Sequence, residues 1–259
     1  MQVIPDAVGA RTGGSIGPDV VIWEADGRPL GAFGYGGCLA RALRSVGARV
    51  ELVRYRDRPL TTAELDAPVH VLSGGETSAF SHDDATLRAR ADLTELMRRA
   101  WHGDATIIGV CLGAQLISRA IAPDVPLSTP LDRMEAGLCE IAGPDGPVWA
   151  AELHYEEIHP AFAEVDGVTV THTNTHSPIQ GFRWGATVSG YQFHPEWTPD
   201  ELAQVLRRHD VVLDTYHRDP AGALASVEPN RHRWSERLLG RLVLDPVLDA
   251  LAVPDATAA

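Results

Sequence analysis

Lysine is absent from this 259-residue sequence, so all 22 basic side chains are arginines. The 35 acidic side chains outnumber them and give the chain a net charge of −13. The arginines are scattered among the acids and form no basic run. This distribution argues against a surface that follows the phosphates of a nucleic acid, so we expect no nucleic-acid partner.

Long apolar runs and paired cysteines are also lacking. No stretch approaches the roughly 18 apolar residues of a membrane span, and the first residues lack the apolar centre of a secretory signal. We therefore expect a soluble, cytoplasmic protein without a membrane partner. Cys38, Cys111 and Cys139 are far apart and include no CxxC pair, which predicts neither a disulfide framework nor a zinc cluster.

What is present is an alternation of two kinds of segment. Apolar runs typical of strands occur at 20–23, 48–56, 68–72, 105–110 and 189–193, and helical periodicity occurs at 39–47 and 83–102. This α/β pattern predicts a mostly parallel sheet with helices on both faces. Alternating residues within 138–175 predict antiparallel strands at one side, and two or three helices are expected in 200–252. We expect a flexible leader (1–19), a main domain (20–200) and a helical extension (201–259) packed on that domain.

Cys111 is the candidate nucleophile. It lies in Gly109-Val-Cys-Leu-Gly113, between the strand run 105–110 and a helical stretch, which is the arrangement of a nucleophile elbow. Small residues on both sides permit a sharp, strained turn, and the N-terminus of the following helix favours a thiolate. The alternative is a buried cysteine beside a glycine-rich turn. Cys38 and Cys139 are expected to pack in the core.

His194 is the candidate base, and Glu196 is the candidate acceptor that orients it. Both lie in Gln192-Phe-His-Pro-Glu196, directly after the last predicted strand. Pro195 restricts the backbone between them, so the carboxylate can accept a hydrogen bond from the imidazole. The alternative is a simple helix-entry turn in which Glu196 is a favourable first-turn acid.

Together these segments resemble the class I (triad) glutamine amidotransferase family. The resemblance covers about residues 20–200, and its motifs occur in the family's order. They are the cysteine segment through Gln115, the His-Pro-Glu segment, Ser73-Gly-Gly75, Glu135-Ala-Gly137 and Thr175-His-Ser177. The resemblance implies a flavodoxin-like fold with a small antiparallel side sheet and extra C-terminal helices.

The resemblance also implies roles for individual residues. Cys111 would attack the side-chain amide of glutamine, His194 would move protons, and Glu196 would orient His194. The backbone N–H groups of Gly75 and Leu112 would form the oxyanion hole. Substrate-binding positions carried over from the family are Gly74, Glu76, Gln115 and Ser177, while the role of His176 stays open. No cofactor and no metal are implied.

The sequence departs from the family at two points. Glu76 stands where many members have proline, which brings a carboxylate near the expected substrate. The roughly 60 residues after Glu196 are too few for a synthetase domain, so ammonia would pass to a separate ATP-dependent synthetase. The alternatives are a free-standing hydrolase of γ-glutamyl amides or related metabolites, and a non-catalytic regulatory subunit.

A metal enzyme is a weaker interpretation. By spacing alone, His154 with His159, or His172 with His176, are candidate ligand pairs. Neither pair is accompanied by a third ligand at diagnostic spacing. The alternating stretch around His172 predicts instead that His172, Asn174 and His176 share one face of a strand.

Overall fold

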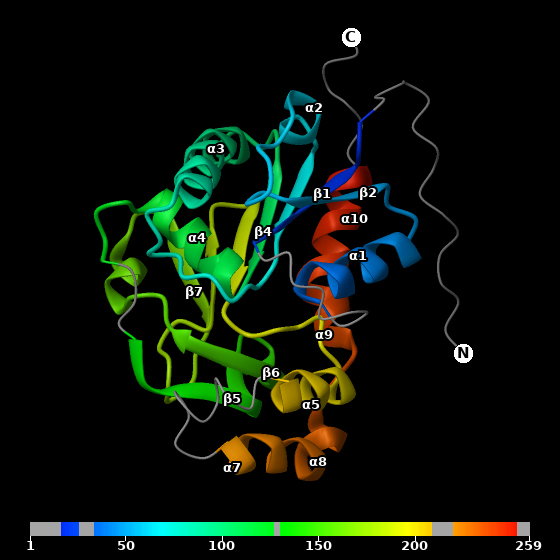
Figure 1. The fold of residues 1–259 in the computed structure, drawn as a ribbon, viewed down its shortest axis with the longest axis vertical. Helices are drawn as coiled ribbons and strands as arrows, with labels where there is room; N and C mark the ends of the chain where they lie inside the picture. Colours follow the sequence, from blue (N-terminus) through cyan, green and yellow to red (C-terminus); the bar gives the residue numbers. More distant parts are fainter. Residues whose placement is uncertain (1–16, 26–33, 127–129, 209–219, 253–259) are drawn as a thin grey trace.

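A computed structural model describes residues 17–25, 34–126, 130–208 and 220–252 of the chain. The expected flexible leader 1–19 lies outside these ranges except for 17–19. Parts of the expected helical extension, 209–219 and 253–259, lie outside them as well. The elements keep the labels drawn in Figure 1.

A seven-stranded sheet forms the centre of the molecule, with strand order β2-β1-β3-β4-β9-β8-β7 (Figure 1). The first five strands in this order, β2, β1, β3, β4 and β9, are parallel. The sixth strand, β8, is antiparallel to both of its neighbours. The strands are β1 (Val20–Glu24), β2 (Val50–Arg54), β3 (Val69–Leu72), β4 (Thr106–Val110), β7 (Val168–His172), β8 (Gly181–Trp184) and β9 (Val188–Tyr191). The mostly parallel sheet predicted from the apolar runs is therefore confirmed.

Helices cover both faces of this sheet (Figure 1). Helices α3 (Asp84–Trp101) and α4 (Leu112–Ile121) pack on one face, while α1 (Tyr35–Ser45) and α10 (Asp245–Ala252) pack on the other. Strands β1 and β3 lie between these layers and are buried along their whole length, which explains why all their residues except Glu24 and His70 are apolar. A short helix, α2 (Thr62–Leu65), precedes β3 and begins at a capping box.

The antiparallel side sheet is a hairpin of β5 (Pro130–Gly143) and β6 (Gly146–Glu156). Helices α5 (Pro199–Arg208), α7 (Pro220–Ala225) and α8 (Val227–Asn230) pack beside it, and its buried apolar side chains form a core with theirs. The third expected strand of this region behaves differently, because β7 pairs with β8 at the edge of the central sheet.

The expectation that His172, Asn174 and His176 share a strand face is wrong. Strand β7 ends at His172, and the side-chain oxygen of Asn174 accepts the backbone N–H groups of His176 and Ser177. An asparagine that captures the backbone two and three residues ahead favours a turn over a strand.

The C-terminal part contains more and shorter elements than the two or three helices expected. After α8 come η3 (Arg231–Arg233), α9 (Arg237–Leu239), a π-helical turn η4 (Gly240–Leu244) and α10. Another 3-10 turn, η2 (Pro160–Glu164), follows the hairpin. Trp234 takes an extended backbone after η3 and separates it from α9. Within the described ranges, no helix has the length and apolar content to cross a membrane.

Candidate active site

Cys111 forms the turn between β4 and α4. Its backbone angles are φ 50° and ψ −111°, and it is the one non-glycine residue with positive φ in the described part of the chain. This conformation costs energy for a residue with a side chain, and such strain is concentrated at functional sites. The predicted elbow is present, and α4 starts at the very next residue.

The two glycines of the elbow are required by close contacts. A Cβ atom on Gly113 would lie 2.2 Å from the carbonyl oxygen of Leu72, at the end of β3. A Cβ atom on Gly109 would lie 2.7 Å from the backbone nitrogen of Ala114. Glycine at both positions therefore allows α4 to begin directly behind the strand ends.

The thiol of Cys111 is buried, and its Sγ lies 3.9 Å from the carbonyl oxygen of Leu153. Burial raises the pKa of the thiol well above its ordinary value; the backbone N–H of Leu112 opposes this shift, and the charge of Glu152 adds to it. This shift favours the neutral thiol over the thiolate. A nucleophilic thiolate needs a base that removes the proton during the reaction.

His194 and Glu196 form a fully buried pair after β9. The His194 Nδ1 lies 2.8 Å from Glu196 Oε1, and the imidazole stacks on Trp197 with ring centroids 3.7 Å apart. His194 Nε2 is buried and has no hydrogen-bond partner among the described residues. When Nδ1–H donates to the carboxylate, Nε2 carries the free lone pair and can accept a proton.

Strand pairing brings the cysteine and the histidine to the same edge of the sheet. Val110 pairs with Tyr191 in register, and the N–H of Cys111 donates to the carbonyl oxygen of Tyr191 over 2.7 Å. His194 follows three residues later. Gly74 lies against it, since a Cβ atom there would come within 2.7 Å of His194 Cε1.

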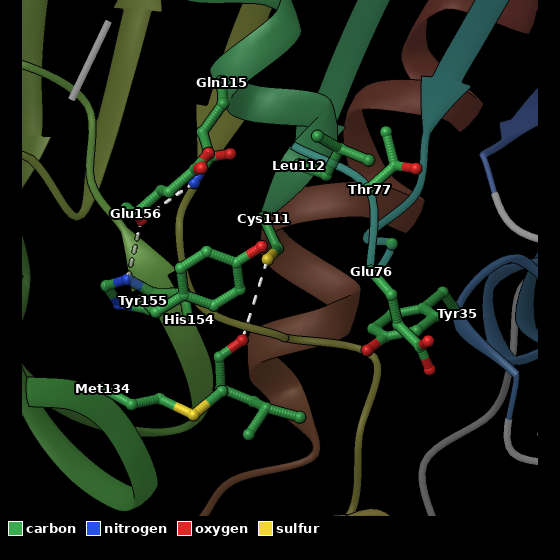
Figure 2. Close-up of a pocket in the computed structure, with 12 residues that line it drawn as sticks. Tyr35, Glu76, Thr77, Cys111, Leu112, Gln115, Met134, His154, Tyr155 and Glu156 are labelled. Atoms are coloured by element: carbon green, nitrogen blue, oxygen red, sulfur yellow. Dashed lines mark hydrogen bonds between the residues drawn. The ribbon is translucent and has the colours of Figure 1, made fainter. Parts of the chain in front are cut away.

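A cavity of about 220 Å³ opens beside Cys111 (Figure 2). Among the predicted site residues, the cavity is lined by Gly75, Glu76, Cys111, Leu112 and Gln115. Gln115 is held in place, because its side-chain amide donates to the carbonyl oxygen of Glu156 over 2.9 Å and to Gln192 Oε1 over 3.3 Å. Glu76 is exposed at the mouth of the cavity.

Other predicted residues do not line this cavity. His194, Glu196 and Gly74 are buried behind it. Ser177 is fully buried, and its hydroxyl donates to Glu157 over 2.7 Å. His176 borders a separate cavity on the outer side of the hairpin.

Several lining residues were not predicted from the sequence. They are Tyr35, Thr77, Met134, Leu153, His154, Tyr155 and Glu156. Two of them had a usable signal: Met134 directly precedes the Glu135-Ala-Gly137 motif, and Thr77 follows the paired glycines. Tyr35 and Tyr155 had no such signal, because the sequence around each of them indicates only secondary structure and contains no motif.

Three buried titratable groups lie together at one wall of the cavity, and one of them, His154, belongs to its lining. His154 Nε2 is 3.2 Å from both Glu135 Oε2 and Glu152 Oε2. Burial lowers the pKa of His154, but the two carboxylates outweigh it and raise that pKa to about 10. Burial, with the charge of Glu135 adding to it, raises the pKa of Glu152 to about 8.

These three groups also have the spacing of a metal site, since their donor atoms all lie within 4.8 Å of one another. They come from facing strands of the β5–β6 hairpin, where Glu135 pairs with His154. Sequence spacings cannot reveal such a set. Of the ligand pairs considered from spacing, only His154 belongs to this set. Its partner in spacing, His159, instead accepts the N–H of Ala161 at the start of η2.

The sequence and the fold were compared with those of known proteins. The model of the family described as "Glutamine amidotransferase class-I" matches residues 33–212. No curated protein matches the chain by sequence.

Solved structures show the same fold. A glutamine amidotransferase from Methylobacillus flagellatus is 18% identical with a TM-score of 0.70, covering 93% of this chain and 98% of its own. A glutamine amidotransferase from Thermotoga maritima is 16% identical with a TM-score of 0.66, covering 91% and 98%. A protein from Thermoplasma acidophilum described as a putative GMP synthase subunit is 18% identical with a TM-score of 0.54, covering 74% and 96%. Because the family match spans more than half of the sequence, the protein belongs to the class-I glutamine amidotransferase family.

Proposed function

We propose that this protein hydrolyses the side-chain amide of glutamine through a γ-glutamyl thioester on Cys111. The observation that carries the proposal is the strained, buried Cys111 at the end of β4, beside the buried His194–Glu196 pair that follows the neighbouring strand β9. A nucleophile, a base and an orienting carboxylate are the three groups that such chemistry needs.

In the first half-reaction, His194 Nε2 removes the Cys111 proton while Sγ attacks the amide carbon. The tetrahedral oxyanion accepts hydrogen bonds from the backbone N–H groups of Leu112 and Gly75, and the positive end of α4 adds to this stabilisation. The carbon–nitrogen bond then breaks, and the leaving nitrogen takes the proton from His194. Ammonia departs, and the acyl group stays on Sγ as a thioester.

Water completes the cycle. His194 removes a proton from a water molecule, whose oxygen attacks the thioester carbon, and the carbon–sulfur bond breaks. Sγ recovers its proton from His194, and glutamate leaves. Gln115 and Glu76 line the cavity and are the groups we assign to holding the α-amino and α-carboxylate ends of glutamine. Gly74 and Ser177 are buried outside the lining and support the site, Gly74 against His194 and Ser177 through its hydrogen bond to Glu157.

The ammonia acceptor in this proposal is a separate ATP-dependent synthetase. One structural relative carries the description of a putative GMP synthase subunit, which is a setting of that kind. A second candidate function is hydrolysis of substituted γ-glutamyl amides. The apolar and aromatic surfaces of Tyr35, Met134, Leu153 and Tyr155 around the cavity favour it, because an unsubstituted amide nitrogen needs no apolar surface.

The test is to incubate the purified full chain with glutamine and, separately, with a panel of γ-glutamyl amides. We expect release of glutamate from at least one of them, lost in Cys111→Ala and retained in the matched Cys139→Ala variant. A glutamine-like diazoketone should label Cys111, as read by peptide mass mapping. Labelling of another cysteine, or full turnover by Cys111→Ala, would contradict the mechanism.

A further inference from the structure

A second, larger cavity of about 560 Å³ lies on another part of the molecule. Its walls are the turn between β5 and β6 with the start of β6, residues of the edge strand β7 and of its neighbours β8 and β9, and the C-terminal segment 233–246. It shares no lining residue with the Cys111 cavity. The segment 233–246 lies beyond residues 33–212, which match the family, so one wall of this cavity comes from outside the family match and the rest from within it.

Positive charge is concentrated in this cavity, although the whole chain carries −13. Among the lining residues, Asp145 is the single acid, whereas the arginines are Arg183, Arg233, Arg237 and Arg241. Asp145 is already bound to Arg241. Three further guanidinium groups therefore line the same space without a carboxylate in the lining, and together they make the local potential positive and attractive to an anion.

Apart from Arg241, the guanidinium groups remain available for a ligand. In the described part of the chain, the side chains of Arg183 and Arg237 make no hydrogen bond or ion pair. The Arg233 guanidinium lies over the ring of Trp149, with its carbon 4.8 Å from the ring centroid. This cation–π contact orients the group and leaves its in-plane N–H donors unused.

The lining also contains a histidine, a tyrosine and a threonine that contact one another. His172 and Tyr191 meet edge to face with ring centroids 5.8 Å apart, and Thr171 Oγ1 lies 2.9 Å from His172 Nδ1. Gly143 allows the β5–β6 turn to approach, because a Cβ atom there would come within 2.9 Å of His172 Cδ2. Hydroxyl groups of Thr169 and Ser235 complete the polar lining.

We propose that this arginine cavity binds a small molecule carrying a phosphate or polyphosphate group. Planar guanidinium groups bind phosphate oxygens in pairs, which fits several arginines converging from different elements. The volume is in the range of small-molecule sites, roughly 300–1,000 Å³. Such a ligand would join Arg183 of β8 to Arg237 of α9, and so connect the C-terminal segment to the edge of the central sheet.

The experiment titrates inorganic pyrophosphate into the full chain at constant ionic strength, with binding read by calorimetry and by the thermal midpoint. We expect saturable binding and a raised midpoint, with affinity at least tenfold weaker in the double variant Arg183→Gln/Arg237→Gln. The matched control is Arg88→Gln/Arg98→Gln on α3, which removes the same charge elsewhere and should bind as the unaltered protein does.

A third variant, Arg237→Glu, alters a single exposed side chain, so it is not expected to disturb folding. It should nevertheless abolish pyrophosphate binding, because it places a negative charge in the cavity. Citrate at equal charge separates phosphate recognition from general attraction of anions, and we expect it to bind at least tenfold more weakly. Absence of saturable pyrophosphate binding, equal affinity in both double variants, or equal affinity for citrate would each overturn the proposal.

Discussion

Gly113 is the residue whose replacement by the smallest side chain should be most damaging. In Gly113→Ala, the new methyl group would lie 2.2 Å from the Leu72 carbonyl oxygen and 2.6 Å from Leu72 Cβ. Neither α4 nor β3 can move without disturbing the core, so we expect a loss of about 2–3 kcal/mol in the free energy of unfolding. Urea denaturation measures it.

Gly37→Ala is the matched control for this change. Gly37 lies inside α1 with no atom within 4 Å of an added Cβ, so alanine should stabilise the protein by roughly 0.5–1 kcal/mol. Equal effects of the two substitutions would contradict the close contact at the elbow.

Glu196→Gln tests the proposed orienting role. The amide would present an N–H group to His194 Nδ1 and reverse the tautomer, so that Nε2 carries a proton and cannot accept one. We expect kcat/KM to fall about 10²- to 10⁴-fold, with the thermal midpoint largely retained.

Glu201→Gln gives the comparison for Glu196→Gln. Glu201 is also a buried carboxylate, but it pairs with Arg41 and binds the N–H and hydroxyl of Thr198 at the start of α5. Its replacement should lower the thermal midpoint while leaving kcat/KM unchanged. The opposite pattern, with activity lost only in Glu201→Gln, would remove Glu196 from the mechanism.

Among the residues of the site, the sequence predicted those whose role depends on neighbours close to them in the chain. The elbow glycines and the His194–Glu196 spacing are constraints within a few residues, and they could be read directly. Tyr35 and Tyr155 line the cavity because α1 and β6 meet the end of β4 in three dimensions. The direction of Ser177, toward Glu157 and away from the cavity, depends on the Asn174 turn in the same way.

Strand β3 carries a buried histidine that makes stability depend on pH. His70 is fully buried: its Nδ1 accepts the Trp23 indole N–H over 3.1 Å, and its Nε2–H donates to the carbonyl oxygen of Ala67 over 3.0 Å. This bonding uses the neutral ring. Burial, with the charge of Arg99 adding to it, lowers the pKa of His70 to about 4 from an ordinary value of 6.5.

The sign of the effect follows from these two values. Between pH 6.5 and 4 the unfolded chain binds a proton at His70 that the folded chain does not, so stability falls as pH falls. Over the whole window the loss amounts to roughly 3 kcal/mol. In His70→Gln the free energy of unfolding should be lower at pH 7 and should depend less steeply on pH in this window. The exposed His82→Gln should leave the slope unchanged, and an unchanged slope in His70→Gln would refute the assignment.

The elements themselves were predictable where their pattern is strong. The buried parallel strands and the long helix α3 have uninterrupted apolar or amphipathic sequences, and they were found at nearly their observed bounds. Strand β8 was missed, and with it the partner of the antiparallel strand β7, because strand partners are set by pairing across the sheet. The short C-terminal turns were missed because proline and π-helical geometry interrupt their helical period.

For the molecule as a whole, the core does not end where the family match ends. Leu238, Val243, Val247 and Leu251 are buried in one apolar cluster with Val20, Ile22, Val69 and Val71 of β1 and β3. Helix α10 thus lies beside α1 on the same face of the sheet, where α10 covers β3 and β4 and α1 covers β1 and β2 (Figure 1). We infer that residues 20–200 and the C-terminal helices form one folding unit, as expected for an extension packed on the same domain.

Removal of residues 220–259 should therefore unfold the protein or leave it without fixed packing. Burial of four aliphatic side chains contributes about 1.5–3 kcal/mol each, which together approaches the roughly 5–15 kcal/mol that stabilises a typical domain. We expect retained far-UV dichroism, lost near-UV dichroism and strong dye binding to exposed apolar surface.

The point variant Val247→Ala should lower the free energy of unfolding by about 2 kcal/mol. Leu87→Ala, on the exposed side of α3, should lower it by less than about 0.5 kcal/mol. A truncated chain that unfolds cooperatively at the same midpoint as the full chain would show that the family domain is stable without α10.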